Sequence, residues 1–166
     1  MSESSAFEGR LAFQEAVLSL LAWAGEHQAR CMAAFDPDFA DWPWSRPQAL
    51  EALQRWAGRG RQLRLLSLQY ETLLQSQPRF VRWRRDYGHL VEAKAIPDDA
   101  PEQELPVALL LIDGGEAGVR GLRLLEKARW RGVLFTDQAT FSQNWHWFDA
   151  VAQRSPDAFP CTTLGL

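Results

Sequence analysis

The sequence has few cysteines, and the two that it has lie far apart. Cys31 falls inside an apolar run and Cys161 lies near the other end of the chain. They supply neither a disulfide framework nor the Cys-x-x-Cys pair of a metal or redox site. We therefore expect a reducing environment, and the cytoplasm fits that expectation best.

Histidine and lysine are also scarce. Three histidines are present: His27, His89 and His146. None of them forms the i, i+4 pair of a helix-borne zinc site. The sequence contains neither a GxxxxGK[ST] phosphate loop nor a GxSxG elbow, and GRGR at 58–61 reads as a helix stop. We therefore expect no catalytic residue, no cofactor and no metal.

Long apolar runs and a dominant charge are missing as well. No apolar run approaches the length of a membrane span, and the opening MSESSAFEGR is too polar for a secretory signal. The 18 basic and 21 acidic residues give a net charge of −3, which creates no overall attraction to nucleic acid or an anionic membrane. We expect a soluble protein with neither of these two partners.

Helix-like and strand-like segments alternate along the first hundred residues. Apolar residues at helical spacing predict helices, and short apolar runs between turn residues predict strands. The helices are expected at about 6–24, 48–58 and 70–88, where Pro78 either kinks the third or opens its second half, and the strands at 30–35, 62–68 and 89–96.

The second half of the chain contains more strands than helices. The polar segment at 97–104 predicts a surface loop. VALLLID, 107–113, is a continuous apolar strand of the kind that is covered on both faces. Two further strands are expected at 118–125 and 132–137, and a last helix near Asp137 or Thr140.

This order predicts an α/β fold with a mostly parallel central sheet flanked by helices and an antiparallel hairpin in its second half. A chain of 166 residues with 46% hydrophobic residues fits one domain, 1–166. Its core is expected at about 7–153, with an irregular tail at 154–166.

The stretch PVALLLIDGG, 106–115, bears on function. It is similar to the strand of a phospholipase D-like half domain that carries His-x-Lys-x-x-x-x-Asp. With Asp113 at the aspartate, Pro106 occupies the histidine position and Ala108 the lysine position. The family's downstream Gly-Ser and Asn fall near three residues here: Arg120, Gly121 and Leu124.

The resemblance implies a phospholipase D-like fold with a degenerate active site, as in some small bacterial proteins. Phosphohistidine chemistry needs an imidazole to attack and a cation to hold the phosphate, and Pro106 and Ala108 supply neither. We therefore expect no enzyme but a binding or interaction module with a protein or small-molecule partner. Its ligand would bind where strands of an α/β sheet end, with Asp36, Asp38 and Asp113 as the candidate residues.

A homodimer is a further expectation. Phospholipase D-like enzymes build their site between two halves, and this chain has the length of one half. The tryptophan loop with Trp42 and Trp44 and the tail CTTLGL are candidate interface segments. The same loop could instead cover the core.

The stretch FDPDFADWPW, 35–44, offers an alternative function. Asp36 and Asp38 after an apolar strand are similar to the first motif of magnesium-dependent phosphatases of the haloacid dehalogenase type. Those enzymes also need a later lysine and an acidic pair, for which Asp98 and Asp99 are poorly placed. In the other interpretation, the aspartates only cap and turn the loop.

Arginines cluster in RFVRWRRDYGH, 79–89. Such a cluster could contact phosphates while Trp83 or Tyr87 stacks on a base. A solvated helix face is the simpler interpretation, because Arg82 and Arg85 share a face and Trp83 points elsewhere.

Overall fold

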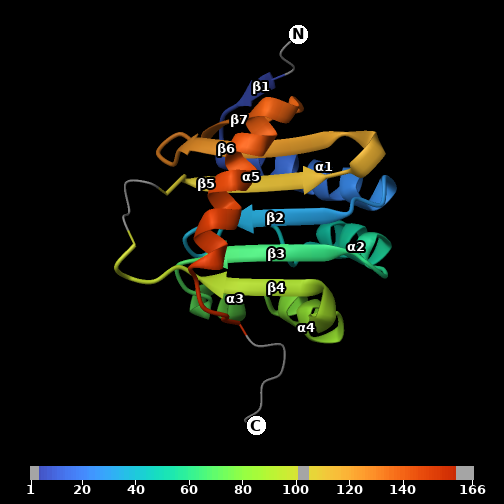
Figure 1. The fold of residues 1–166 in the computed structure, drawn as a ribbon, viewed down its shortest axis with the longest axis vertical. Coiled ribbons are helices and arrows are strands. Elements are labelled where there is room, and N and C mark those ends of the chain that lie inside the picture. Colours follow the sequence, from blue (N-terminus) through green and yellow to red (C-terminus); the bar gives the residue numbers. More distant parts are fainter. Residues whose placement is uncertain (1–3, 101–104, 160–166) are drawn as a thin grey trace.

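The computed structural model describes residues 4–100 and 105–159, and its centre is a seven-stranded sheet (Figure 1). The strands are ordered β1-β7-β6-β5-β2-β3-β4 across the sheet. Their bounds are β1 Ser4–Phe7, β2 Cys31–Phe35, β3 Gln62–Ser67, β4 Val91–Ala95, β5 Ala108–Asp113, β6 Val119–Glu126 and β7 Arg131–Phe135.

Strand direction divides the sheet into two parts. The pairs β2–β3 and β3–β4 are parallel, because a helical crossover returns the chain to the same edge each time. The pairs β1–β7, β7–β6, β6–β5 and β5–β2 are all antiparallel. The α/β class and the antiparallel second half are confirmed, whereas the prediction of a mostly parallel sheet is wrong.

Helices cover both faces of the sheet. The long helix α5 crosses one face, and the helices of the first half cover the other (Figure 1). None of the described helices is long and apolar enough to cross a membrane. The helices are α1 Arg10–Glu26, α2 Pro47–Trp56, α3 Glu71–Ser76, α4 Pro78–Asp86 and α5 Gln138–Gln153, with 3-10 turns at Gly88–Leu90 and Gly115–Ala117.

The alternation of side chains along the strands creates two cores. In β2, Met32 and Ala34 face the layer of α1 and α2, whereas Ala33 and Phe35 face α5. Strand β5 is buried along nearly its whole length because both of its faces are covered in this way. The continuous apolar run of β5 is therefore explained by the burial of both faces of this strand.

The two ends of the described chain add features that the pattern did not predict. The exposed strand β1 stands where a helix was expected to begin, and Gly9, with φ 108°, turns the chain into α1. At the other end the tail continues the sheet edge, since the N–H groups of Ala95 and Ala158 donate to the carbonyls of Pro156 and Ala93, at 3.0 and 2.9 Å. CTTLGL lies outside the described residues.

Candidate functional site

The C-terminal ends of β2, β3 and β4 and the N-terminal end of β5 all lie at the same end of the strands. The antiparallel register pairs Phe35 with Leu109 and Cys31 with Asp113. Asp36 therefore lies near the start of β5, whereas Asp113 lies at the opposite end of the strands. The structure brings Asp36 and Asp38 together and places Asp113 apart from them.

Asp36 is held inside its own loop. The side chain is 3% exposed, and Oδ2 accepts hydrogen bonds from the backbone N–H groups of Asp38 and Phe39, at 3.0 and 2.7 Å. Burial raises the pKa of Asp36 to about 6, against the lowering effect of these bonds. Asp38 in turn accepts from the N–H of Ala40 at 2.9 Å. Both carboxylates thus close a turn, as the simpler interpretation of this loop expected.

The two lysines that could serve a phosphatase already have partners, although the charge of Lys127 also acts on Asp36. Lys94 Nζ donates to the Ser155 carbonyl at 3.3 Å, and Lys127 pairs with Asp41 at 3.4 Å. Within residues 4–100 and 105–159 no three His, Cys, Asp or Glu residues are grouped so that they could hold a metal ion. The geometry therefore favours a turn over a magnesium centre.

The positions aligned with the phospholipase D histidine and lysine are part of the packed interior. Pro106 is buried, and Ala108 is 0% exposed within the core below α1 and α2. At the far end of the same strand, Asp113 Oδ1 accepts from the N–H of Gly115 at 2.9 Å and the carboxylate lies 3.5 Å from Arg30. Asp113 is a turn residue with an exposed ion-pair partner.

The tryptophan loop is folded into the core. Trp42 is 2% and Trp44 0% exposed, and their rings stack with centroids 5.4 Å apart. Trp42 also meets the edge of Phe13 at 5.5 Å. In this chain the two indoles are not an exposed surface, so the structure favours the loop as a cover over the core.

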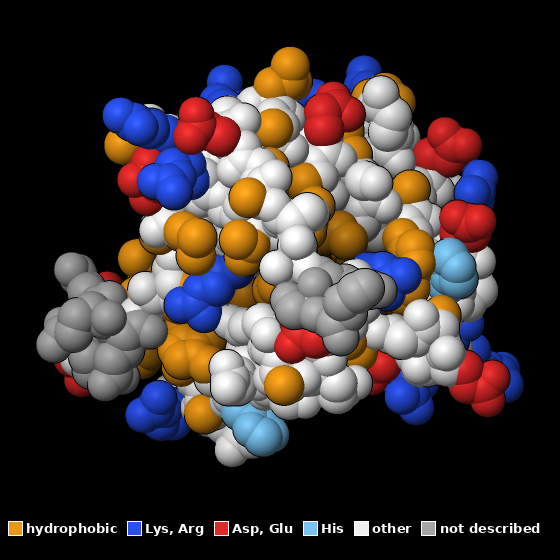
Figure 2. All heavy atoms as spheres, turned by 90° about the horizontal axis from the view of Figure 1, so that it is seen from above, with side chains coloured by type: hydrophobic (Ala, Val, Ile, Leu, Met, Phe, Trp, Pro, Cys, Tyr) orange, Lys and Arg blue, Asp and Glu red, His pale blue; other side chains and the backbone are white. Residues whose placement is uncertain are grey.

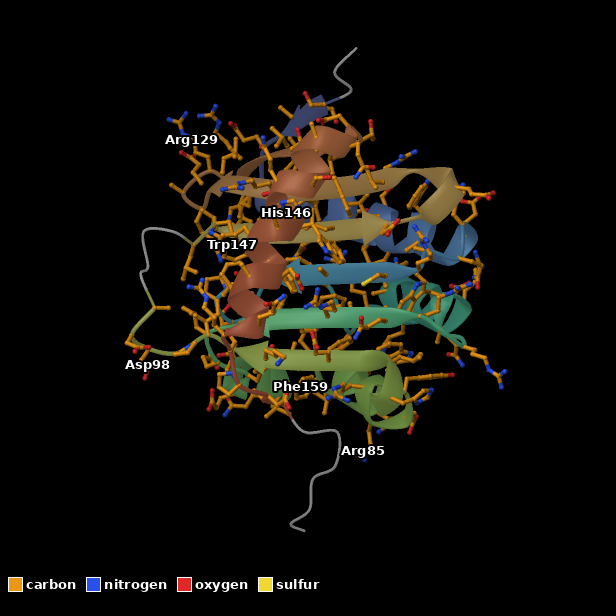
Figure 3. All side chains as sticks on the ribbon, in the orientation of Figure 1. Arg85, Asp98, Arg129, His146, Trp147 and Phe159 are labelled. Carbon is orange, nitrogen blue, oxygen red and sulfur yellow. The ribbon has the colours of Figure 1, made fainter. Side chains whose placement is uncertain are left out.

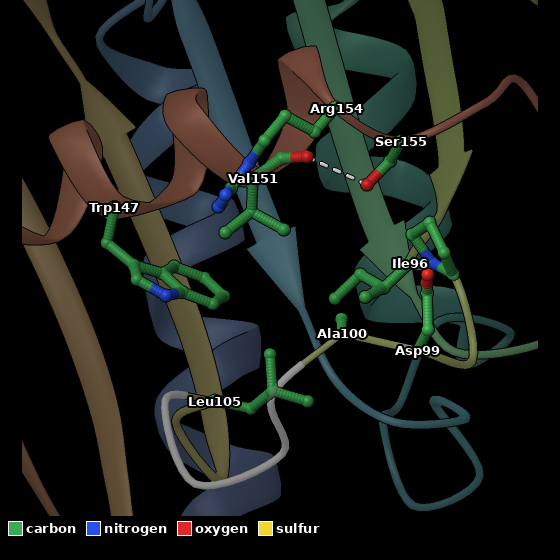
Figure 4. A pocket seen from close by; sticks show the side chains of 9 residues that line it. Ile96, Asp99, Ala100, Leu105, Trp147, Val151, Arg154 and Ser155 are labelled. Carbon is green, nitrogen blue, oxygen red and sulfur yellow. Dashed lines mark hydrogen bonds between the residues drawn. The ribbon is translucent and has the colours of Figure 1, made fainter.

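A pocket of about 350 Å³ lies at the edge of the sheet where β4 ends. Trp147 and Val151 of α5 face Ala100 and Leu105 of the β4–β5 connection across it (Figure 4). Its lining also includes one cation, Arg154, and one acid, Asp99. The charges of the pocket therefore select neither an anionic nor a cationic ligand.

A different surface is formed by α4 and the turn between α2 and β3. We call it the arginine surface and define it by six residues: Arg59, Arg61, Arg79, Arg82, Tyr87 and His89. It contains two grooves of about 650 and 370 Å³, and Tyr87 lines both of them. Arg59 and Arg61 line the larger groove, and Arg79 and Arg82 the smaller one.

The arginine surface is locally basic although the chain as a whole is acidic. Asp86 is the acid that lines its grooves, against four arginines. Arg59, Arg79 and Arg82 are exposed. By contrast, basic and acidic side chains are interspersed on the face seen from the β1 end of the sheet (Figure 2).

The sequence revealed only half of this surface. The spacing of α4 predicted an exposed arginine face, but GRGR was interpreted only as a helix stop, and nothing in the pattern places Arg59 and Arg61 beside Tyr87. That the two pairs of arginines share grooves with one aromatic residue is visible only after folding.

Comparison with known proteins shows the fold. The chain matches TrmBL2, an archaeal chromatin protein with a novel mode of DNA binding, at a TM-score of 0.62 and 13% identity. The match covers 93% of this chain and 54% of TrmBL2, so the chain spans about half the length of that neighbour.

Two further solved structures match over nearly their whole length. NucT from Helicobacter pylori has a TM-score of 0.58 and 13% identity, with 95% of this chain and 100% of NucT covered. Nuc from Salmonella typhimurium, a phospholipase D family member, has a TM-score of 0.58 and 12% identity, with 94% and 99% covered. No protein-family model and no curated protein sequence matches the chain.

These comparisons also correct the expectation of no nucleic acid partner. That expectation rested on the net charge, and a fold neighbour is a DNA-binding chromatin protein. Phosphate contacts depend on local arginines and not on the overall charge. At these identities the comparisons establish one property of the chain, which is a phospholipase D-like fold.

Proposed function

We propose that this protein is a non-catalytic phospholipase D-like domain that binds nucleic acid through the arginine surface. The observation that carries the proposal is the arrangement of Arg59, Arg61, Arg79 and Arg82 along two grooves with one acid among them. A guanidinium group presents several N–H donors to a phosphate, which makes arginine well suited to a nucleic acid backbone.

The non-catalytic part of the proposal rests on the interior packing at Pro106 and Ala108. A nucleophile at position 106 and a cation at position 108 would both need an open approach to the phosphate, and both positions are buried. This packing supports the proposal that the catalytic groups of phospholipase D-like enzymes are absent from this chain. In the alignment that starts from Asp113, residues of the packed interior stand at both catalytic positions.

The proposal includes a homodimer, because a phospholipase D-like half leaves uncovered the surface that meets its partner. Since Trp42 and Trp44 are buried, the contact would have to use other residues. A two-fold contact between identical chains is the commonest arrangement for such a surface.

Binding is tested with a fluorescein-labelled 20-nucleotide strand and the corresponding duplex, by anisotropy at 50 and 200 mM NaCl. Arg79→Gln combined with Arg82→Gln should weaken binding and reduce the slope of log K against log salt by about one per arginine that contacts phosphate.

Arg129→Gln is the matched control, because it removes an exposed charge from the hairpin at the other end of the molecule from α4, whose position Arg85 marks in Figure 3. It should leave both affinity and slope nearly unchanged. The proposal is overturned if neither oligonucleotide binds at micromolar concentrations in 50 mM salt, or if Arg129→Gln weakens binding as much as the double variant.

A further inference from the structure

We infer that Tyr87 is a stacking platform for an unpaired base, so that the arginine surface binds single strands in preference to duplexes. This inference rests on the proposed function and specifies which form of nucleic acid the surface recognises.

The first observation is a ladder of aromatic rings that runs from the core to the surface. The rings of Trp44 and Phe80 are 4.7 Å apart, those of Phe80 and Trp83 are 5.8 Å apart, and those of Trp83 and Tyr87 are 5.2 Å apart. The interplanar angles are 30°, 22° and 28°, so each ring is stacked on the next.

Exposure rises along this ladder. Phe80 is 0% and Trp83 6% exposed, whereas Tyr87 is only half-buried. Phe80, Trp83 and Tyr87 follow one another at i, i+3 and i+7, which places them on one side of α4 and its C-terminal cap. The inner rings thus hold Tyr87 in a fixed orientation before any ligand arrives, which lowers the entropic cost of stacking.

The second observation is that Tyr87 shares its surroundings with cations. It lines both the groove that contains Arg59 and Arg61 and the groove that contains Arg79 and Arg82. A single strand can place phosphates on both sides of the ring while it turns a base onto the aromatic group. In a duplex the bases are already paired and stacked, so the same surface can reach only the backbone.

Three 15-nucleotide probes separate the contributions of base and backbone: oligo-dT, the dA·dT duplex, and an abasic strand with the same number of phosphates. We expect oligo-dT to bind at least five times more tightly than the abasic strand. Loss of stacking in Tyr87→Ala should weaken oligo-dT binding about 5- to 150-fold, since stacking on an aromatic side chain contributes about 1–3 kcal/mol per base. The abasic strand should bind both proteins equally.

Tyr87→Phe retains the ring and should retain the preference for oligo-dT, which distinguishes stacking from a role of the hydroxyl. Unfolding curves of both variants establish that the chain remains folded. Equal affinity for the oligo-dT and abasic strands, or an unchanged oligo-dT affinity in folded Tyr87→Ala, refutes the stacking platform while the proposed function stands. If none of the three probes binds, both proposals fail.

Discussion

Replacement of Asp36 by asparagine should stabilise the protein at neutral pH. The folded chain raises the pKa of this carboxyl from 3.8 to about 6, chiefly through burial. The folded chain therefore binds the proton more tightly than the unfolded chain does. The resulting stabilisation is fully present below pH 3.8 and is lost as the pH rises through about 6.

The magnitude follows from the difference between the two pKa values. A difference of about two units corresponds to about 3 kcal/mol of lost stability in the ionised state, at 1.36 kcal/mol per unit. The asparagine side chain of the variant would carry no charge, and its carbonyl oxygen could still accept from the N–H groups of Asp38 and Phe39. Because its buried amide also needs a partner, we expect a net gain of about 1–3 kcal/mol at pH 7.5.

The assay is urea unfolding followed by tryptophan fluorescence, at pH values from 4 to 8, for the wild type and Asp36→Asn. The free energies of unfolding should be closest at pH 4 and diverge as the pH rises to about 7. A gain of 2 kcal/mol would also raise the Tm by about 4–8 °C, given the usual relation for a chain of this size. A variant less stable than the wild type by 1 kcal/mol or more at pH 7.5 would refute the reasoning, since the ionised carboxylate would then stabilise the turn.

Four further outcomes are expected. The protein should show no phosphodiesterase turnover above a buffer control on lipid or nucleic acid substrates. Turnover that disappears on mutation of Asp113 would contradict the proposal of a non-catalytic domain, which rests on Pro106 and Ala108. Magnesium should leave the Tm unchanged, whereas a magnesium-dependent rise abolished by Asp36→Asn would support the phosphatase. Gly121→Ala should lower stability by about 1–3 kcal/mol in urea unfolding, because its Cβ would lie 2.2 Å from the Phe135 ring, and an unchanged midpoint would show that the ring can move. Light scattering coupled to size exclusion should give twice the chain mass of 18.9 kDa, and a mass near 18.9 kDa would exclude the homodimer under those conditions.

Local patterns predicted the elements well because each element has its own signature. The strand expected at 62–68 is β3, Gln62–Ser67, and Pro78 begins α4 as its fixed φ allows. Asp137 caps α5, where its side chain accepts from the N–H of Thr140. The exposed strand β1 was missed because four residues with little burial carry no periodic signal.

Strand direction could not be predicted in the same way. A continuous apolar run such as that of β5 indicates that both faces of the strand are covered, and it carries no information on whether the neighbouring strands are parallel or antiparallel. In this chain α1 and α5 cover both faces of an antiparallel strand. The long connection from β4 to β5 carries no crossover helix among its described residues. Strand β5 therefore begins at the end of the sheet where β4 finishes, and it lies beside β2.

The error in direction decided which candidate residues could meet. If β5 were parallel to β2, Asp113 would lie beside Asp36, and the three acids could have formed one cleft. Because β5 is antiparallel to β2, Asp113 is paired with Cys31 at the other end of the strands from Asp36. The arginine surface likewise depends on how separate elements pack, since the packing of α2 against α4 places Arg59 and Arg82 on the same surface. Sequence spacing within one element predicts which residues share a face, whereas a site built from several elements depends on the direction and order in which they pack.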